Sequence, residues 1–213
     1  KIYNKFTDKI IDEALQSKTQ LYDKNSDYHY DTISAFIKSV RGSDPDAAIY
    51  WMAVMLEGGE KPEFILRRLI ILASEDIGNA DPQALQIAVA GFQATNIIGM
   101  PESAIILSQI TAYLASAPKS NASYIAINHA QEKVKKDGTP DVPLHLRNAT
   151  TNLMKKENHG KNYKYPHNYS DKFVKENYFP SGLQETFYQP TNSGYENYIR
   201  ERLIKNWPER YNT

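Results

Sequence analysis

The segment from residue 31 to residue 82 constrains the fold most, because prolines divide it into three helical segments. In the first of them, apolar side chains recur at i, i+3, i+4 and i+7, the period of a helix. Asp44 can cap the second segment, and Pro45 occupies its first position, where a missing N–H costs nothing. The second segment, residues 47–56, is apolar on nearly every side, which predicts a central helix. Short connections then require the three helices to pack as neighbours.

Prolines also separate the predicted helical segments beyond residue 82. Prolines at positions 45, 62, 82, 101 and 118 are 17, 20, 19 and 17 residues apart. This spacing suits helices longer than the usual mean of about 11 or 12 residues. In the helix expected over residues 83–98, the predicted buried face consists of large and small apolar side chains: Leu85, Ala88, Val89 and Phe92.

These segments predict an all-α fold, an irregular multi-helix bundle. An α-solenoid with repeat corners at Pro45, Pro82 and Pro118 is the alternative, since the spacing is regular. The residues around those corners are not alike, and no tetratricopeptide or ankyrin signature occurs. Irregular packing is therefore preferred.

After residue 137 the chain becomes polar and rich in tyrosine. Residues 128–178 contain ten basic and six acidic side chains, and eight of the 15 tyrosines follow residue 160. Disordered segments are usually poor in aromatic residues. We therefore expect an extended arm whose rings dock on the helical body or on another subunit, with a short helix near residues 147–156 and a closing helix over residues 195–206.

Composition excludes several classes of site. The chain has no cysteine, so disulfides and thiolate metal sites cannot form. No two of the five histidines are four residues apart, and no G-x-x-x-x-G-K-[ST], G-x-G-x-x-G, G-x-S-x-G or H-E-x-x-H run occurs. No apolar run is long enough for a membrane span. The start at Lys1, without a leader, suggests a fragment of a longer protein or a processed product.

Two charged pairs in the central segment require partners. Glu75 and Asp76 fall at the end of a predicted helix, where the macrodipole disfavours anions by up to about 1 kcal/mol. A structural ion pair with Arg67, Arg68 or Arg147 is the favoured explanation. A catalytic acid pair is the alternative, although no nucleophile or base accompanies it.

Arg67 and Arg68 diverge by about 100° around their helix, so at least one is expected to reach a partner. A salt bridge, within or between subunits, competes with a phosphate contact. Because the segment contains no recognisable active site, we predict that it serves assembly. Tyr50, Trp51, Arg67 and Arg68 are the candidate oligomer interface.

The arm interleaves cations with rings, a combination typical of proteins that bind single-stranded nucleic acid. Tyrosines that anchor the arm to a protein surface would explain the pattern equally well. The candidate nucleic-acid contacts are Lys155, Lys156, Lys161, Tyr163, Lys164 and Tyr165.

Several blocks in one order carry a family resemblance. They are SAFIKSVRGSDPDAAIYWMAVMLEGGEKPEFILRRLIILASEDIGNADP, YLASAPKSNASY, DVPLHLRNATTNLMK, YKYPHNY, YFP and FYQPTNSGYE. Over about residues 25–205 the chain resembles the C-terminal part of the RarA/MgsA family of AAA+ ATPases, which includes the eukaryotic Werner-helicase-interacting ATPases.

The resemblance implies a domain organisation. Residues 1–24 would be the end of the preceding lid domain and a linker. Residues 25–137 would form a helical domain like the collar of clamp loaders, which holds the ATPase as a homotetramer. Residues 138–213 would be the basic, tyrosine-rich arm and its closing helix, packed on the collar.

It also implies a function and partners. The family maintains replication forks, in the cytoplasm and associated with the nucleoid, with single-stranded DNA or DNA ends and the single-stranded DNA-binding protein as partners. ATP and magnesium belong to an N-terminal core whose motifs have no counterpart here. This chain alone is therefore expected to have no catalytic, cofactor-binding or metal-binding residues and no ATPase activity. The alternatives are a module that binds single-stranded DNA or DNA ends, a freestanding α-solenoid-like scaffold, or an unrecognised hydrolase.

Overall fold

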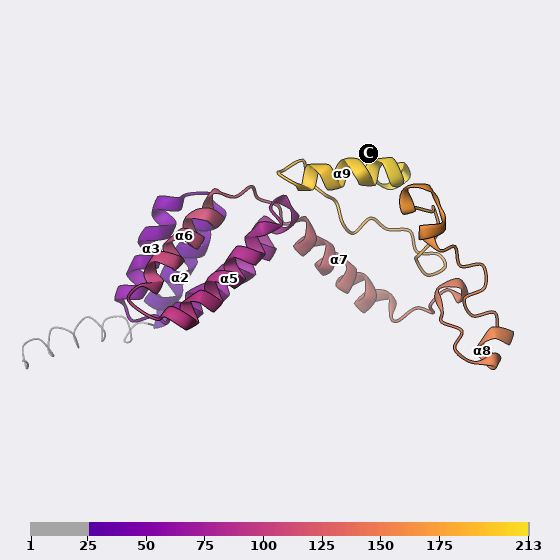
Figure 1. Cartoon of the computed structure of the whole chain (residues 1–213), viewed down its shortest axis with the longest axis horizontal. Coiled ribbons are helices and arrows are strands. Elements are labelled where there is room, and N and C mark those ends of the chain that lie inside the picture. The colour runs from indigo at the N-terminus through magenta and orange to yellow at the C-terminus, as the bar shows by residue number, and fades with distance from the viewer. Residues whose placement is uncertain (1–25, 213) are drawn as a thin grey trace, which may run out of the picture. The chain divides into compact units, whose positions relative to one another are not determined.

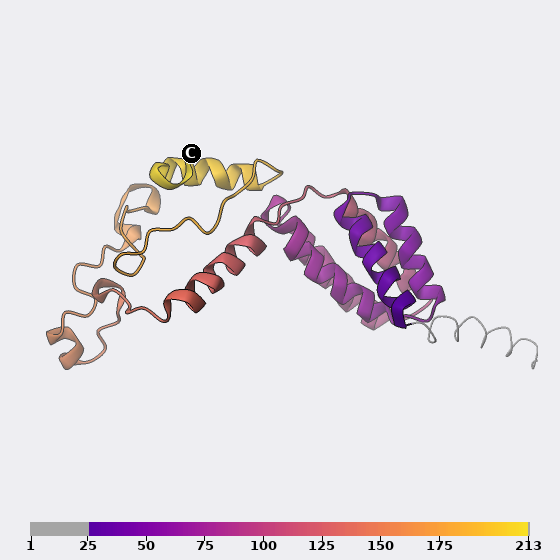
Figure 2. The same ribbon diagram turned by 180° about the vertical axis from the view of Figure 1, so that it is seen from behind.

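The computed structural model describes residues 26–212, so the lid segment predicted for residues 1–24 lies outside it. All regular structure in the described range is helical, which confirms the all-α fold. The chain divides into two compact units (Figures 1 and 2). Among the described residues, the first comprises residues 26–121 together with Ser193–Tyr195, and the second comprises Ala122–Asn192 together with residues 196–212. The division predicted at residue 137 remains a prediction.

The first unit contains five α-helices among its described residues. Their bounds are α2 Ser26–Arg41, α3 Pro45–Glu57, α4 Pro62–Leu72, α5 Gln83–Ile98 and α6 Ser103–Ser116. A π-helical turn, Ala73–Ile77, and a 3₁₀ turn, Gly78–Ala80, connect α4 to α5. The predicted cap of α3 is confirmed, because the Asp44 carboxylate accepts the backbone N–H of Ala47 at 2.9 Å.

The centre of this unit is α6 and not α3. Helix α6 packs against α2, α3, α4 and α5, and Figure 1 labels it between α3 and α5. Helix α3 buries Ala48, Met52 and Met55 but leaves Tyr50 63% exposed. The prediction of a central α3 was wrong because an outer face that is itself apolar cannot be recognised from periodicity. The largest fully buried side chains around α6 are Phe36, Met55, Ile65, Leu66, Leu69, Leu72, Ile77, Leu107 and Leu114.

Helix α5 also turns a different face inward from the predicted one. It buries small residues, which are Ala84, Ala88, Gly91 and Thr95. Of the predicted face only Ala88 is fully buried, Phe92 is half-buried, and Leu85 and Val89 are exposed. A Cβ atom added to Gly91 would lie 1.9 Å from the Ile110 Cδ1 atom, so the missing side chain allows α5 to lie close against α6.

The second unit has few helices and long connections. Its α-helices are α7 Ala122–Asp137, α8 Asn152–Lys156, α9 Glu196–Asn206 and α10 Pro208–Tyr211, and short 3₁₀ turns lie at Leu144–Leu146, Pro166–Asn168 and Ser170–Lys172. The closing helix predicted from residue 195 is confirmed and begins at Glu196. The predicted helix near residues 147–156 is confirmed for its last five residues, where the Thr151 hydroxyl accepts the backbone N–H of Met154. Most of the late tyrosines remain exposed in this unit, and their docking on a protein surface remains a prediction.

Within residues 26–212, no helix combines the length and apolar character that a membrane crossing requires.

Candidate interaction surfaces

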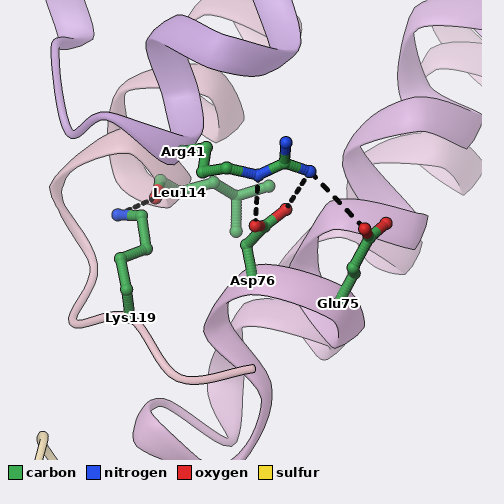
Figure 3. Close-up of polar contacts among 5 residues, drawn as sticks. All are labelled: Arg41, Glu75, Asp76, Leu114 and Lys119. Atoms are coloured by element: carbon green, nitrogen blue, oxygen red, sulfur yellow. Dashed lines mark hydrogen bonds and ion pairs between the residues drawn. The ribbon is translucent and has the colours of Figure 1, made fainter. Parts of the chain in front are cut away.

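The acidic pair Glu75 and Asp76 lies in the π-helical turn after α4 and contacts an arginine from α2 (Figure 3). The Arg41 guanidinium donates to both carboxylate oxygens of Asp76, from Nε and, at 3.2 Å, from Nη2. Nη2 also lies 3.5 Å from a carboxylate oxygen of Glu75. The predicted structural ion pair is therefore present, but its partner is Arg41 and not Arg67, Arg68 or Arg147. This pairing depends on how α2 packs beside α4, which spacing along the chain does not reveal.

The segment after α6 contributes a lysine near the acidic pair (Figure 3). The Lys119 ammonium donates to the carbonyl oxygens of Leu114, Ala115 and Ala117 at 3.1, 2.9 and 2.6 Å. These carbonyls belong to the end of α6, where the helix leaves them without partners. Burial lowers the pKa of Lys119, and the charge of Asp76 opposes that shift. Arg41 binds the two carboxylates and Lys119 binds the end of α6. These contacts support a structural role for the acidic pair.

The corner between the 3₁₀ turn and α5 contains a second polar contact that sequence reasoning missed. The Tyr113 hydroxyl donates to Asp81 at 2.5 Å, and the other carboxylate oxygen of Asp81 accepts the backbone N–H of Gln83. This hydrogen bond, together with burial, raises the pKa of Tyr113 to about 12. The only sequence signal was the Asp-Pro pair at this corner.

A glycine from late in the chain approaches the first unit's backbone closely. Gly194 has a φ of +53°, and a Cβ atom there would lie 2.2 Å from the Ala80 carbonyl oxygen and 2.8 Å from Pro118 Cγ. The adjacent Tyr195 N–H donates to the same carbonyl at 2.8 Å. The position therefore accepts only glycine without displacing backbone.

The next residue, Glu196, is completely buried at the start of α9. Its carboxylate accepts hydrogen bonds from the Tyr188 hydroxyl at 2.8 Å and from the Thr191 amide and hydroxyl at 3.0 and 2.7 Å. It thereby fixes the segment before α9 to that helix. Sequence reasoning did not single out Gly194 or Glu196, although both lie in the run FYQPTNSGYE that contributed to the family resemblance.

The four candidate interface residues lie on two helices of the first unit. Tyr50 and Trp51 are on α3, with their rings 5.4 Å apart, and Trp51 is half-buried against the core. Arg67 and Arg68 are exposed on α4, with guanidinium carbons 5.8 and 5.3 Å from the centre of the Phe64 ring. Neither arginine has an ion-pair partner among residues 26–212. The assignment of these residues to an interface remains a prediction.

The six candidate nucleic-acid residues are spread along the arm. Lys155 and Lys156 end α8, and Lys161 and Lys164 line one open pocket of about 390 Å³. Lys164 is not free, because its ammonium lies 3.0 Å from Glu176, and this contact raises the pKa of Lys164. Tyr163 and Tyr165 are exposed. Their role in nucleic-acid binding remains a prediction.

An exposed apolar surface on α5 and the start of α6 was missed by the sequence reasoning. Leu85 and Val89 lie in the first half of α5, and Ile97, Ile98, Met100 and Ile105 lie between its last turn and the first turn of α6; these six exposed residues are called here the α5–α6 apolar surface. Ile97 is 84% exposed and Ile105 is 74% exposed. The signal was present in the run TNIIGMPESAII, where large apolar residues flank a Gly-Met-Pro turn.

The residues that the structure describes, 26–212, do not fit an ATP–magnesium site. The sequence contains no phosphate-binding loop, and the described residues include no group of three or more His, Asp or Glu side chains that could hold a metal ion. The nucleotide chemistry of the resembling ATPases is therefore not attributed to these residues.

Comparison with known proteins gives consistent matches over most of the chain. Residues 42–207 match a family described as MgsA AAA+ ATPase C terminal, and residues 2–41 match one described as AAA C-terminal domain. A Thermotoga maritima protein without a functional name is 49% identical over 93% of this chain and 32% of its own length.

Two named relatives are almost as similar. The replication-associated recombination protein A of Coxiella burnetii is 46% identical over 92% of this chain and 45% of its own length. The protein of that name from Haemophilus influenzae is 46% identical over 91% of this chain and 44% of its own length. The chain thus spans less than half the length of these relatives. It belongs to the RarA/MgsA family of AAA+ ATPases and corresponds to the C-terminal region of that family.

Proposed function

We propose that this chain is the oligomerisation domain of a replication-associated AAA+ ATPase and that copies of it assemble into a homotetramer. The observation that carries the proposal is the orientation of α5. This helix turns its small residues toward the core and leaves Leu85, Val89 and Ile97 in water. Large apolar side chains left exposed on an otherwise well-packed unit favour a protein partner.

The free energy available from this surface is substantial. Burying an isoleucine side chain that was exposed contributes about 1.5 to 3 kcal/mol. Ile97 and Ile105 both start from a nearly fully exposed state, so they have the most to gain from contact with another copy. Arg67 and Arg68, which lack ion-pair partners among the described residues, can add charged contacts at the edge of such an interface.

Substitution at the α5–α6 apolar surface tests this proposal. We expect the double variant I97S/I105S to raise the dissociation constant of the oligomer by more than about tenfold, measured by sedimentation velocity over a range of concentrations. Leu153→Ser is the matched control, because Leu153 is also 66% exposed but lies on α8, outside this surface. Circular dichroism should be unchanged in both variants. Wild-type assembly of the double variant would refute the proposed surface.

A second proposed activity is contact between the arm and single-stranded DNA. Lys155, Lys156 and Lys161 are exposed and make no ion pair within the described residues, and exposed tyrosines follow them. Free cations near exposed rings can hold a strand by its phosphates and stack its bases. Lys164 contributes less, because Glu176 already neutralises it.

The salt dependence of DNA binding tests this second proposal. The variant K155E/K156E/K161E should weaken binding of a fluorescent single-stranded oligonucleotide. It should also reduce the slope of log K against log salt by about 0.7 for each phosphate that the protein no longer neutralises. The variant K38E/K135E/K136E changes the charge equally at exposed lysines elsewhere and serves as the control. Equal weakening of binding in both variants would show that only overall charge matters.

In the whole protein, we propose that an N-terminal core supplies ATP hydrolysis with magnesium, and that the single-stranded DNA-binding protein is a partner on the nucleoid. Family membership supports these assignments. This chain's contribution would be to hold the copies of that core together.

A further inference from the structure

A pocket of about 360 Å³ in the second unit has an unusual set of charges. It lies where α9 packs against α10. Its size falls in the range of small-ligand sites, which begins at about 300 Å³. The polar side chains that line it are those of Thr186, Gln189, Arg200, Glu209, Arg210 and Tyr211.

Two guanidinium groups, from Arg200 on α9 and Arg210 on α10, line this pocket without an acidic partner among residues 26–212. The nearest acid along the same helix face is Glu196, one turn before Arg200. Its carboxylate is already occupied by hydrogen bonds from Tyr188 and Thr191. Both cations are half-buried, so solvent screens them less than free surface charges.

Arg210 is held in position by aromatic rings. Its guanidinium carbon lies 4.4 Å from the centre of the Trp207 ring and 5.1 Å from that of Phe179. A guanidinium that stacks on rings keeps its N–H groups free at its edges, in the planar fork that matches a phosphate group. The stacking therefore fixes a donor group and leaves its hydrogen-bonding capacity unused.

The one acid that lines the pocket forms its ion pair with a lysine, although the charge of Arg210 also acts on it. Glu209 lies 3.0 Å from the Lys175 ammonium, and hydrogen bonds from its own backbone and from Lys175 keep the pKa of Glu209 below its usual range. Burial raises the pKa of Tyr211, so its hydroxyl remains protonated and can donate. The pocket thus combines two guanidinium groups that form no ion pair within residues 26–212, one of them beside the Glu209 carboxylate, with neutral donors.

We propose that this pocket binds a phosphomonoester group. Such a group carries a charge of about −1.5 to −2 at pH 7 and three acceptor oxygens, which complement two guanidinium forks. A phosphodiester carries a single negative charge and complements the pair less well. The group can come from a free nucleotide or from the phosphorylated end of a nucleic-acid strand. This site is separate from the assembly surface and from the arm lysines, and does not depend on either proposal.

Calorimetric titration of the whole chain with inorganic phosphate tests the site. Arg200→Gln should weaken phosphate binding by about tenfold, because it removes a charge-assisted hydrogen bond. The matched control is Arg202→Gln, which removes the same charge from an exposed position on the same helix that does not line the pocket. That variant should bind phosphate within about twofold of wild type. Arg210→Lys keeps the charge but loses the planar fork, and should also weaken binding.

Two further titrations identify the source of the group. Thymidine 5′-monophosphate represents a free nucleotide, and a short thymidine oligonucleotide with a 5′-phosphate represents a strand end, with the 5′-hydroxyl oligonucleotide as its control. Binding that depends on Arg200 in either titration supports the site and names the source. The proposal is overturned if phosphate shows no saturable binding up to about 10 mM, or if R200Q and R202Q weaken it equally.

Discussion

At the residue scale, single polar side chains connect neighbouring secondary-structure elements through hydrogen bonds and ion pairs. Asp44 could be predicted from sequence, because a helix cap interacts with the next three residues of its own chain. The Arg41–Asp76 ion pair could not be predicted, since its partners are 35 residues apart and meet only through packing. Glu196 was missed for the same reason, because its burial depends on the segment that folds back over it.

Substitution of Glu196 tests whether a single buried carboxylate stabilises the fold. Glu196→Gln leaves the shape unchanged but replaces one acceptor oxygen of the carboxylate with an amide that cannot accept. We expect a loss of about 1 to 3 kcal/mol in the free energy of unfolding, measured by urea denaturation, because buried donors lose their partner. Glu201→Gln, at an exposed position on the same helix, is the control and should change stability by less than about 0.5 kcal/mol. Equal effects would contradict the role of the buried carboxylate.

The Tyr113–Asp81 hydrogen bond predicts a dependence of stability on pH. The pKa of Tyr113 is about 12 in the folded chain and about 10 in the unfolded chain. The contribution of this hydrogen bond is therefore complete below about pH 10 and is lost as the pH rises toward 12, because only the unfolded chain releases the proton in that interval.

Tyr113→Phe should remove this contribution. The stability difference between wild type and Y113F, measured by urea denaturation, should be constant up to about pH 9 and shrink above about pH 10. Tyr50→Phe, at an exposed tyrosine, is the control and should show no such change. A difference that stays constant through about pH 11 would mean that the hydrogen bond does not shift the titration.

At the element scale, sequence periodicity located the helices of the first unit better than their faces. The proline corners correctly marked the starts of α3 and α4. The predicted inner face of α5 was largely wrong, because hydrophobicity favours burying Leu85 and Val89, whereas packing density favours the small residues beside α6. Helix α5 has buried small residues and exposed large apolar residues, and periodicity alone cannot tell which of the two faces is buried.

Gly91 tests how closely α5 and α6 pack. Gly91→Val places new atoms on the buried Ile110 side chain and should lower the free energy of unfolding by about 1 to 3 kcal/mol. Helix propensity favours Val over Gly, so without the contact at Ile110 this substitution would raise stability. Ala90→Val, at the adjacent exposed position, is the control and should lower stability by less than about 1 kcal/mol. Thermal unfolding of both variants gives the comparison. A melting temperature of G91V at or above that of the wild type would show that α6 does not constrain position 91.

At the scale of the whole molecule, the ordered sequence blocks indicated the family, and the comparisons confirm it. The homotetramer that the resemblance implies remains a prediction. An interface lies between chains, so a single sequence shows only what one chain leaves exposed, such as Ile97 and Ile105. For the same reason, the sequence does not show whether the exposed tyrosine rings of the arm contact a protein surface or a nucleic-acid strand.

The molar mass of the chain in solution tests the central claim most directly. Light scattering coupled to size-exclusion chromatography, at micromolar protein concentrations, should give about four times the single-chain mass of 24.3 kDa. The mass should fall toward that of one chain on dilution, because the interface is a reversible contact between folded units. A mass of one chain at every concentration up to the highest soluble one would contradict an assembly role for this domain.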